Sequence, residues 1–169
     1  MKDIHVYDIA TRTWYTQQAT YFGNNVPPDR EGACGVVASA PDGSSHNIYI
    51  FGGNKDSDMF NEVWILTLPT FQWVRTRSGN DKRRTGHTCT KVRGTYMLVY
   101  RGYIPGFGCD DNAGVQLMDL TTLQWDSKIG PGGGDQGGDS DDGYKVPEVI
   151  YSIIGGGYVD ILLPVPTNV

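Results

Sequence analysis

The sequence has little cysteine and no long apolar run, and these absences exclude several classes of protein. Only Cys34, Cys89 and Cys109 occur in 169 residues, too few for a disulfide scaffold, and no C-x-x-C spacing indicates zinc or redox chemistry. One disulfide with one free thiol, or three reduced thiols, both fit this count. The most apolar segment, 149–165, is broken by three glycines and an aspartate, so no membrane span is expected in this chain.

A secretory leader, an N-x-S/T acceptor and a basic stripe are also missing. The opening residues contain no apolar core of signal-peptide length, which leaves the localisation open. The chain has 14 basic and 19 acidic residues, a net charge of −5, and its cations cluster only at Lys82–Arg84. A nucleic-acid partner is therefore not expected.

Glycine and aromatic residues are what the sequence has in quantity. It contains 23 Gly, 10 Tyr and 4 Trp, without a three-residue glycine period. This composition is typical of many short strands joined by tight turns. The sequence therefore favours an all-β fold.

Three tryptophans mark an internal repeat. Trp14, Trp73 and Trp125 are 59 and 52 residues apart, and the eleven residues that end at each of them align without gaps. Apolar residues recur eight and five positions before each Trp, and a Thr recurs three positions before it. Each copy predicts a hairpin in which an apolar strand, a turn and a Trp-bearing return strand follow one another.

A second set of matches lies upstream of the last two tryptophans. An R-x-G motif at Arg30–Gly32 and again at Arg84–Gly86 opens a strand-like run. Each run is followed by an apolar strand that ends in glycine, at Gly52-Gly53 and at Gly102. Each unit of about fifty residues thus predicts four antiparallel strands that must stack on neighbouring units to bury both faces.

These motifs resemble the Kelch repeat. Tyr7 and Trp14 keep the aromatic pair of that family, Gly52-Gly53 keeps its diglycine, and Arg84-Thr-Gly-His87 is similar to its first strand. Other copies drift, because Leu66 and Met118 replace the Tyr and Arg101 replaces the first glycine. The resemblance implies an all-β, partial Kelch-type β-propeller with about two and a half blades.

A further resemblance is to the last blade of fungal Kelch-repeat ectodomains, which are similar in fold to the central domain of galactose oxidase. It rests on the strand ending at Gly102, the hairpin ending at Trp125, Tyr144-Lys-Val-Pro147 and Ile154-Gly-Gly156. It implies an extracellular or cell-surface location for a longer parent protein.

The repeat divides the chain into segments. We expect a partial blade at 4–20, whole blades at 30–78 and 84–129, a flexible Gly/Asp-rich loop at 130–143, and a C-terminal strand and tail at 144–169. A closed propeller has about 4–8 blades, so the chain is expected to be a fragment of a larger protein.

The chemistry-bearing residues favour a non-catalytic chain without cofactor or metal. The three histidines, His5, His46 and His87, are not paired at short spacing, and no G-x-S-x-G motif occurs. Calcium binding by the Gly/Asp tract is a weaker alternative, because its spacing fits no known loop template. The carboxylates concerned are Asp135, Asp139, Asp141 and Asp142.

One disulfide pairing follows from the predicted blade and the resemblance. Cys89 lies in the first strand of the last blade, and Cys109 lies in the loop after its second strand. In the ectodomains that the chain resembles, a bridge at this place would hold the loop on its blade. We therefore expect Cys89 to pair with Cys109 and Cys34 to stay a buried thiol.

Function in a propeller usually resides in the loops at its rims, because the strands are committed to packing. The candidate loops are Asn54–Asn61, Gly79–Arg84 and Tyr103–Asn112. The last loop carries Tyr103, Pro105 and Phe107, which suit contacts with a protein or pack within the loop itself. We expect a protein-interaction or scaffold module. The alternatives are carbohydrate or cell-wall binding, or a remnant of a galactose-oxidase-like enzyme.

Overall fold

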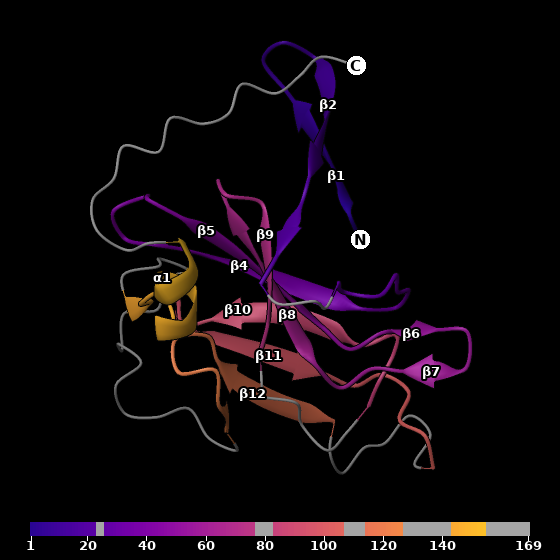
Figure 1. The fold of residues 1–169 in the computed structure, drawn as a ribbon. Helices are drawn as coiled ribbons and strands as arrows, with labels where there is room; N and C mark the ends of the chain where they lie inside the picture. The colour runs from indigo at the N-terminus through magenta and orange to yellow at the C-terminus, as the bar shows by residue number, and fades with distance from the viewer. Residues whose placement is uncertain (23–25, 77–82, 107–113, 127–142, 155–169) are drawn as a thin grey trace.

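The computed structural model describes residues 1–22, 26–76, 83–106, 114–126 and 143–154. Three antiparallel units follow one another along this part of the chain, and strands dominate each of them (Figure 1). The expected all-β fold, built from units of four antiparallel strands, is confirmed.

The units are an N-terminal hairpin, a central blade and a C-terminal blade. The hairpin pairs β1 (Asp3–Asp8) with β2 (Thr13–Gln18). The central blade contains, from its inner to its outer edge, β4 (Cys34–Ser39), β5 (His46–Phe51), β8 (Val63–Leu68) and β9 (Gln72–Arg75). The C-terminal blade contains β10 (Thr88–Val92), β11 (Tyr96–Tyr100), β12 (Val115–Asp119) and β13 (Trp125–Asp126).

Three shorter strands complete the sheets. β3 (Thr20–Tyr21) runs parallel to β9 along the outer edge of the central blade. β6 (Asn54–Lys55) and β7 (Asp58–Met59) form a small hairpin between β5 and β8.

The turns before the tryptophans repeat in detail. Asp8 Oδ1 accepts hydrogen bonds from the backbone of Ala10 and Thr11 at 2.8 and 3.2 Å. Asp119 Oδ1 accepts the equivalent pair, from Thr121 and Thr122, at 2.8 and 3.0 Å. The residue two positions before each Trp has a positive φ, with values of 56°, 51° and 60° at Arg12, Phe71 and Leu123. The hairpins predicted from the sequence therefore share one backbone conformation.

Two hydrophobic cores fill the spaces between the three units. Because side chains alternate along a strand, the central blade presents Val63 and Ile65 to the C-terminal blade and Trp64 and Leu66 to the N-terminal hairpin. Tyr49 contributes to the first core and donates a 2.8 Å hydrogen bond to Leu120 O of the C-terminal blade. Both faces of the central blade are thus buried.

The C-terminal segment differs from the expected strand. Within 144–169 the structure describes 144–154, where α1 (Glu148–Ile154) is a helix whose Ile150 is fully buried against both blades. The apolar residues Val149, Ile150, Ile153 and Ile154 have helical spacing, and Pro147 immediately precedes the first turn, where it fits well. Among the described residues, no helix has the length and apolarity needed to cross a membrane.

Candidate interaction surface

Glycines at the ends of β5 and β11 let the backbone of the next segment approach closely. Gly52 and Gly53 have φ values of +61° and +87°, and both are buried. A Cβ on Gly52 would lie 2.6 Å from His87 Cε1 and 2.7 Å from Arg84 O. The diglycine therefore packs against the R-x-G-H segment of the following blade, where a side chain would clash.

The arginine of each R-x-G motif has one repeated contact. Arg30 donates from Nη1 to Gly52 O at 3.0 Å, and Arg84 donates from Nη1 to Arg101 O at 3.1 Å. The two acceptor residues, Gly52 and Arg101, occupy the same repeat position, which is that of the first glycine in the diglycine motif. The motif thus fixes the loop after the second strand of each blade.

Main-chain hydrogen bonds join the two blades at this end. Glu31 and Asn54 exchange two backbone bonds of 2.9 Å, and Thr85 and Tyr103 form the equivalent bridge one blade later. Across the blade boundary, Thr85 Oγ1 donates to Asn54 Oδ1 at 2.6 Å. Gly53 N donates to Arg84 O at 2.9 Å, also across this boundary. A continuous belt of hydrogen bonds therefore crosses from one blade to the next.

We call this end the rim, made of Glu31, Asn54–Phe60, Thr85 and Tyr103–Gly106. It includes the β6–β7 hairpin and lies at the opposite end of the blades from α1 (Figure 1). Lys55 to Asp58 are exposed.

The predicted loops 54–61 and 103–112 lie on the rim as far as they are described. Tyr103 is 46% exposed and Pro105 is exposed, while Ile104 between them is buried. Arg84 N, at the end of the third loop, donates to Phe60 O at 3.4 Å. Phe107, residues 79–82 and 107–112 lie outside the described residues.

A charged cluster beside the rim was not predicted from the sequence. Glu62 accepts hydrogen bonds from Arg30 at 3.2 Å, Arg75 at 2.6 Å and Trp64 Nε1 at 2.7 Å. Burial acts to raise the pKa of Glu62, but the bond from Trp64 and the charges of Arg75 and Arg30 outweigh it, and the pKa lies below its usual value. The cluster joins residues distant in the sequence, so no local motif indicates it.

The three repeated tryptophans have the same position but different exposure. Trp73 is buried between the central blade and the hairpin, and its Nε1 donates to Met1 O. Trp125 packs on Phe51 of the preceding blade, with ring centroids 4.8 Å apart. Trp14 is 64% exposed, and its ring contacts Tyr7 at 5.0 Å. Trp73 and Trp125 thus pack against the unit that precedes their own, whereas no such unit covers Trp14 among the described residues.

The cysteine pairing expected from the sequence is wrong for Cys89, and the expectation of a free thiol at Cys34 is wrong as well. A disulfide joins Cys89 to Cys34, with 5.4 Å between Cα atoms, and Cys109 lies outside the described residues. Relative to the R-x-G motifs, the two cysteines are offset by one residue, Cys34 four positions after its Arg and Cys89 five. Since successive side chains point to opposite faces, Cys34 and Cys89 face each other between the contacting inner strands β4 and β10.

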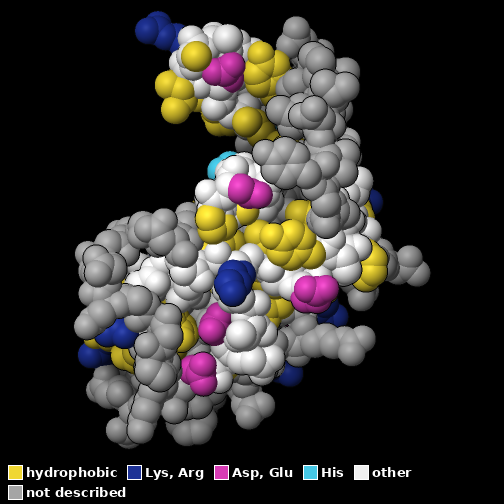
Figure 2. All heavy atoms as spheres, turned by 90° about the vertical axis from the view of Figure 1, so that its left-hand side faces the viewer, with side chains coloured by type: hydrophobic (Ala, Val, Ile, Leu, Met, Phe, Trp, Pro, Cys, Tyr) yellow, Lys and Arg dark blue, Asp and Glu magenta, His cyan; other side chains and the backbone are white. Residues whose placement is uncertain are grey.

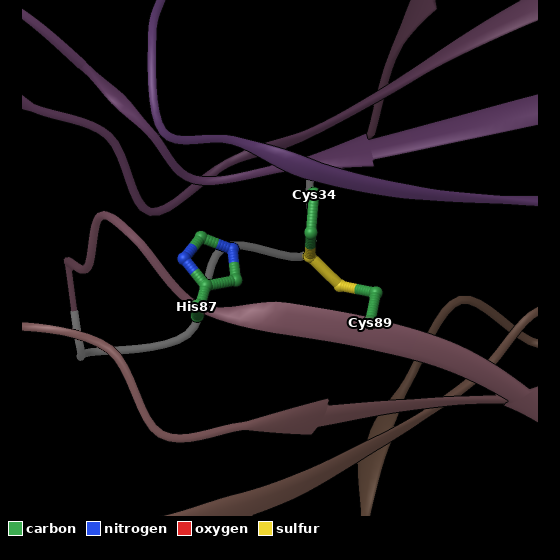
Figure 3. A group of neighbouring side chains, drawn as sticks. All are labelled: Cys34, His87 and Cys89. Carbon is green, nitrogen blue, oxygen red and sulfur yellow. A yellow bond between two sulfur atoms is a disulfide. The ribbon is translucent and has the colours of Figure 1, made fainter.

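His87 lies beside this disulfide (Figure 3). Its Nε2 donates to Phe51 O at 3.1 Å, and its ring packs on Phe51 with centroids 5.2 Å apart. Burial lowers the pKa of His87 to about 4; the Phe51 hydrogen bond offsets it in part, and the Arg84 charge reinforces it. The imidazole is therefore neutral at pH 7.

The other candidate ligands are dispersed. The side chain of His5 contacts Thr16 and that of His46 contacts Ser39, on two different units, and both histidines are exposed. In the described part of the chain, Cys34, His87 and Cys89 are the one group of three with metal-binding side chains in reach of each other. The four aspartates of the Gly/Asp tract lie outside the described residues.

The stacked four-stranded sheets, the R-x-G contacts and the repeated Trp hairpins define a Kelch-type propeller segment. The chain matches the family model of the KLHDC2/KLHL20/DRC7 Kelch-repeats domain over residues 1–160. It belongs to the Kelch-repeat family, whose members generally act as protein-interaction modules.

Curated relatives agree with this assignment. A Kelch repeat-containing protein of Arthroderma benhamiae is 33% identical over 92% of the chain and 26% of its own length. Kelch domain-containing protein 1 of Mus musculus is 28% identical over 59% of the chain and 23% of its own length. The Rab9 effector protein with kelch motifs of Mus musculus is 26% identical over 73% of the chain and 31% of its own length. The chain thus spans about a quarter to a third of these relatives.

Proposed function

We propose that the chain is a non-catalytic interaction module that binds a protein partner through the rim. The observation that carries this proposal is the convergence of two separate loops, 54–60 and 103–106, on one end of the blades. There the hydrogen-bond belt holds them in place. Binding surfaces commonly consist of loops positioned by a rigid scaffold.

Tyr103 is the proposed anchor of this surface. Its backbone is held by both bonds of the Thr85 bridge, and its side chain is nearly half exposed. A tyrosine loses little conformational entropy on binding and buries a large area, which suits a contact of high energy. The same rim also carries exposed carboxylates, at Glu31, Asp56 and Asp58.

A photo-crosslinking amino acid placed at position 103 tests the proposal. A matched position is Tyr151 on α1, which is 42% exposed and lies at the opposite end of the blades (Figure 1). We expect a protein to cross-link at 103 and not at 151 when the chain is expressed within its parent. With the purified partner, Tyr103→Ala should weaken binding about tenfold or more, and Tyr151→Ala should leave it unchanged.

Equal cross-linking at both positions, or binding unaffected by Tyr103→Ala, would show that the rim is not the binding surface.

Carbohydrate binding at the same loop is the second candidate function, favoured by the exposed aromatic ring of Tyr103. A glycan array with the wild-type chain and Tyr103→Ala distinguishes it, because a lectin would bind defined glycans only through the intact tyrosine.

We further propose that the chain functions as part of a longer propeller similar to the fungal Kelch-repeat ectodomains. The partial match to longer relatives and the 64% exposure of Trp14 support this proposal. Hydrophobic side chains gather on the hairpin in the upper part of Figure 2, where a preceding blade would cover them.

Quantitative copper analysis of the full parent tests the galactose-oxidase alternative, since a copper-free parent would exclude radical-copper chemistry.

A further inference from the structure

Cys34, Cys89 and His87 bring two sulfur atoms and one imidazole together between the blades. Their potential ligand atoms all lie within 4.8 Å of one another, and His87 is 6% exposed (Figure 3). A ring nitrogen of His87 lies on the side that faces the two sulfur atoms (Figure 3). Sulfur and imidazole nitrogen are the ligands that zinc prefers, at bond lengths of about 2.0–2.3 Å.

The surroundings suit a neutral metal complex. The cluster lies beside Phe51, which is fully buried, and the charge of Arg84 acts on His87. Two thiolates and a neutral imidazole around a divalent cation give a net charge of zero, so burial of the complex avoids the cost of an uncompensated charge. Nδ1 of His87 has no hydrogen-bond partner among the described residues, so the bond from Nε2 to Phe51 O is the one hydrogen bond that orients the ring there.

We propose that reduction of the Cys34–Cys89 disulfide turns this inter-blade staple into a three-ligand site for a thiophilic divalent cation such as Zn²⁺. The ligands are Cys34 Sγ, Cys89 Sγ and one ring nitrogen of His87. Three protein ligands leave one position of a tetrahedral site for water or another donor. In the oxidised chain neither sulfur is a thiolate, so the two states exclude each other.

The chemistry balances with a dithiol as reductant. The dithiol gives two electrons and two protons to the disulfide; the S–S bond breaks, two thiols form, and the dithiol becomes a cyclic disulfide. Metal binding then releases the two thiol protons. His87 keeps one proton, which moves from Nε2 to Nδ1 if Nε2 coordinates, and the hydrogen bond to Phe51 O is exchanged for the metal bond.

Cobalt(II) titration of the full 169-residue chain tests the site. After reduction with dithiothreitol and removal of the excess reductant under argon, we expect thiolate-to-cobalt charge-transfer absorption that saturates at one cobalt per chain. Zinc should displace the cobalt and abolish the absorption. The same chain with its disulfide intact should give no such absorption, and this comparison requires no substitution.

Variants assign the ligands. Cys34→Ser and Cys89→Ser should each weaken binding by at least about 100-fold, since loss of outer-shell partners alone costs about 10–100-fold. Cys109→Ser is the matched control and should bind as the wild type does. Circular dichroism of each reduced variant checks that the sheets persist. Absence of the charge-transfer absorption in the folded, reduced wild type overturns the proposal, and so does binding that Cys34→Ser leaves intact or Cys109→Ser abolishes.

Discussion

At the scale of single residues, contacts across a blade boundary are made by groups that also hold their own blade. Arg30 reaches the carbonyl of Gly52, while the Cα of Gly52 lies against His87 of the next blade. Thr85 forms a bridge with Tyr103 and a hydrogen bond with Asn54. Substitution of one such residue is therefore expected to affect both blades.

Gly52→Ala should be more destabilising than Gly43→Ala. Both glycines have a positive φ, +61° and +72°, but nothing lies within 4 Å of a Cβ on Gly43, while one on Gly52 meets His87 and Arg84. Backbone strain alone costs about 1 kcal/mol, and the clash at Gly52 brings the loss to about 2–5 kcal/mol. Urea unfolding of both variants measures the difference, and equal losses would show that close approach is irrelevant at Gly52.

Glu62→Gln should destabilise the chain by about 1–3 kcal/mol at pH 7, because Arg30 is buried and loses its charged partner. The folded pKa of Glu62 lies below the unfolded value of about 4.5. Its stabilising contribution is thus complete above pH 4.5 and is lost as the pH falls through the folded pKa.

The pH profile of the unfolding free energy checks this prediction. The wild type and Glu62→Gln should differ most above pH 4.5 and converge in acid. Glu148→Gln is the control, because the exposed Glu148 forms no ion pair among the described residues, and it should change the stability by less than about 0.5 kcal/mol. A constant difference between wild type and Glu62→Gln down to low pH would contradict the assignment.

At the scale of strands and helices, the sequence predicts well whatever the repeat specifies. The hairpins before Trp14, Trp73 and Trp125 were predictable because the turn residues and the apolar spacing recur in all three copies. The helix Glu148–Ile154 occurs once, and its residues are β-branched and apolar enough to resemble a strand. The packing of Ile150 against both blades, which the local sequence does not contain, decides its conformation.

The same repeat position should differ in energy from one unit to the next. Trp73→Ala should cost about 3–5 kcal/mol, because its ring is 1% exposed between two units. Trp14→Ala should cost less than about 1 kcal/mol in this chain, since the ring is 64% exposed. Chemical denaturation compares the two, and a large loss for Trp14→Ala would indicate that another segment covers it in solution.

At the scale of the whole molecule, the pairing of cysteines depends on how blades face each other. The resemblance favoured a link within one blade, from Cys89 to Cys109. The one-residue offset between Cys34 and Cys89 in the aligned motifs was the available signal for a link between blades. The offset predicts this link only when the direction in which the blades stack is known. The rim contacts of Asn54 with Thr85 and of Gly53 with Arg84 have the same origin, since they join segments that meet only after the blades stack. The Glu62 cluster instead forms inside the central blade, where the folding of that sheet brings Arg30 and Arg75 to Glu62.

Peptide mapping under non-reducing conditions should recover a peptide pair that contains Cys34 and Cys89. The bridge spans 55 residues, so the loop-entropy relation gives a stabilisation of about 4 kcal/mol. Cys34→Ala should lower the unfolding free energy by about this amount and should make it insensitive to reductant. Cys109→Ala should retain the full response to reductant, and recovery of a Cys89–Cys109 peptide pair instead would refute the inter-blade link.

The connections between the two blades have a mechanical consequence. At the rim end the belt joins Gly53 to Arg84 and Asn54 to Thr85. At the far end the Tyr49 hydroxyl holds Leu120. Two sheets connected at both ends resist sliding along their strands, and they also resist rotating apart about one end. A load applied to a loop at the rim would therefore pass into both blades together, and the pair would respond as one stiff body.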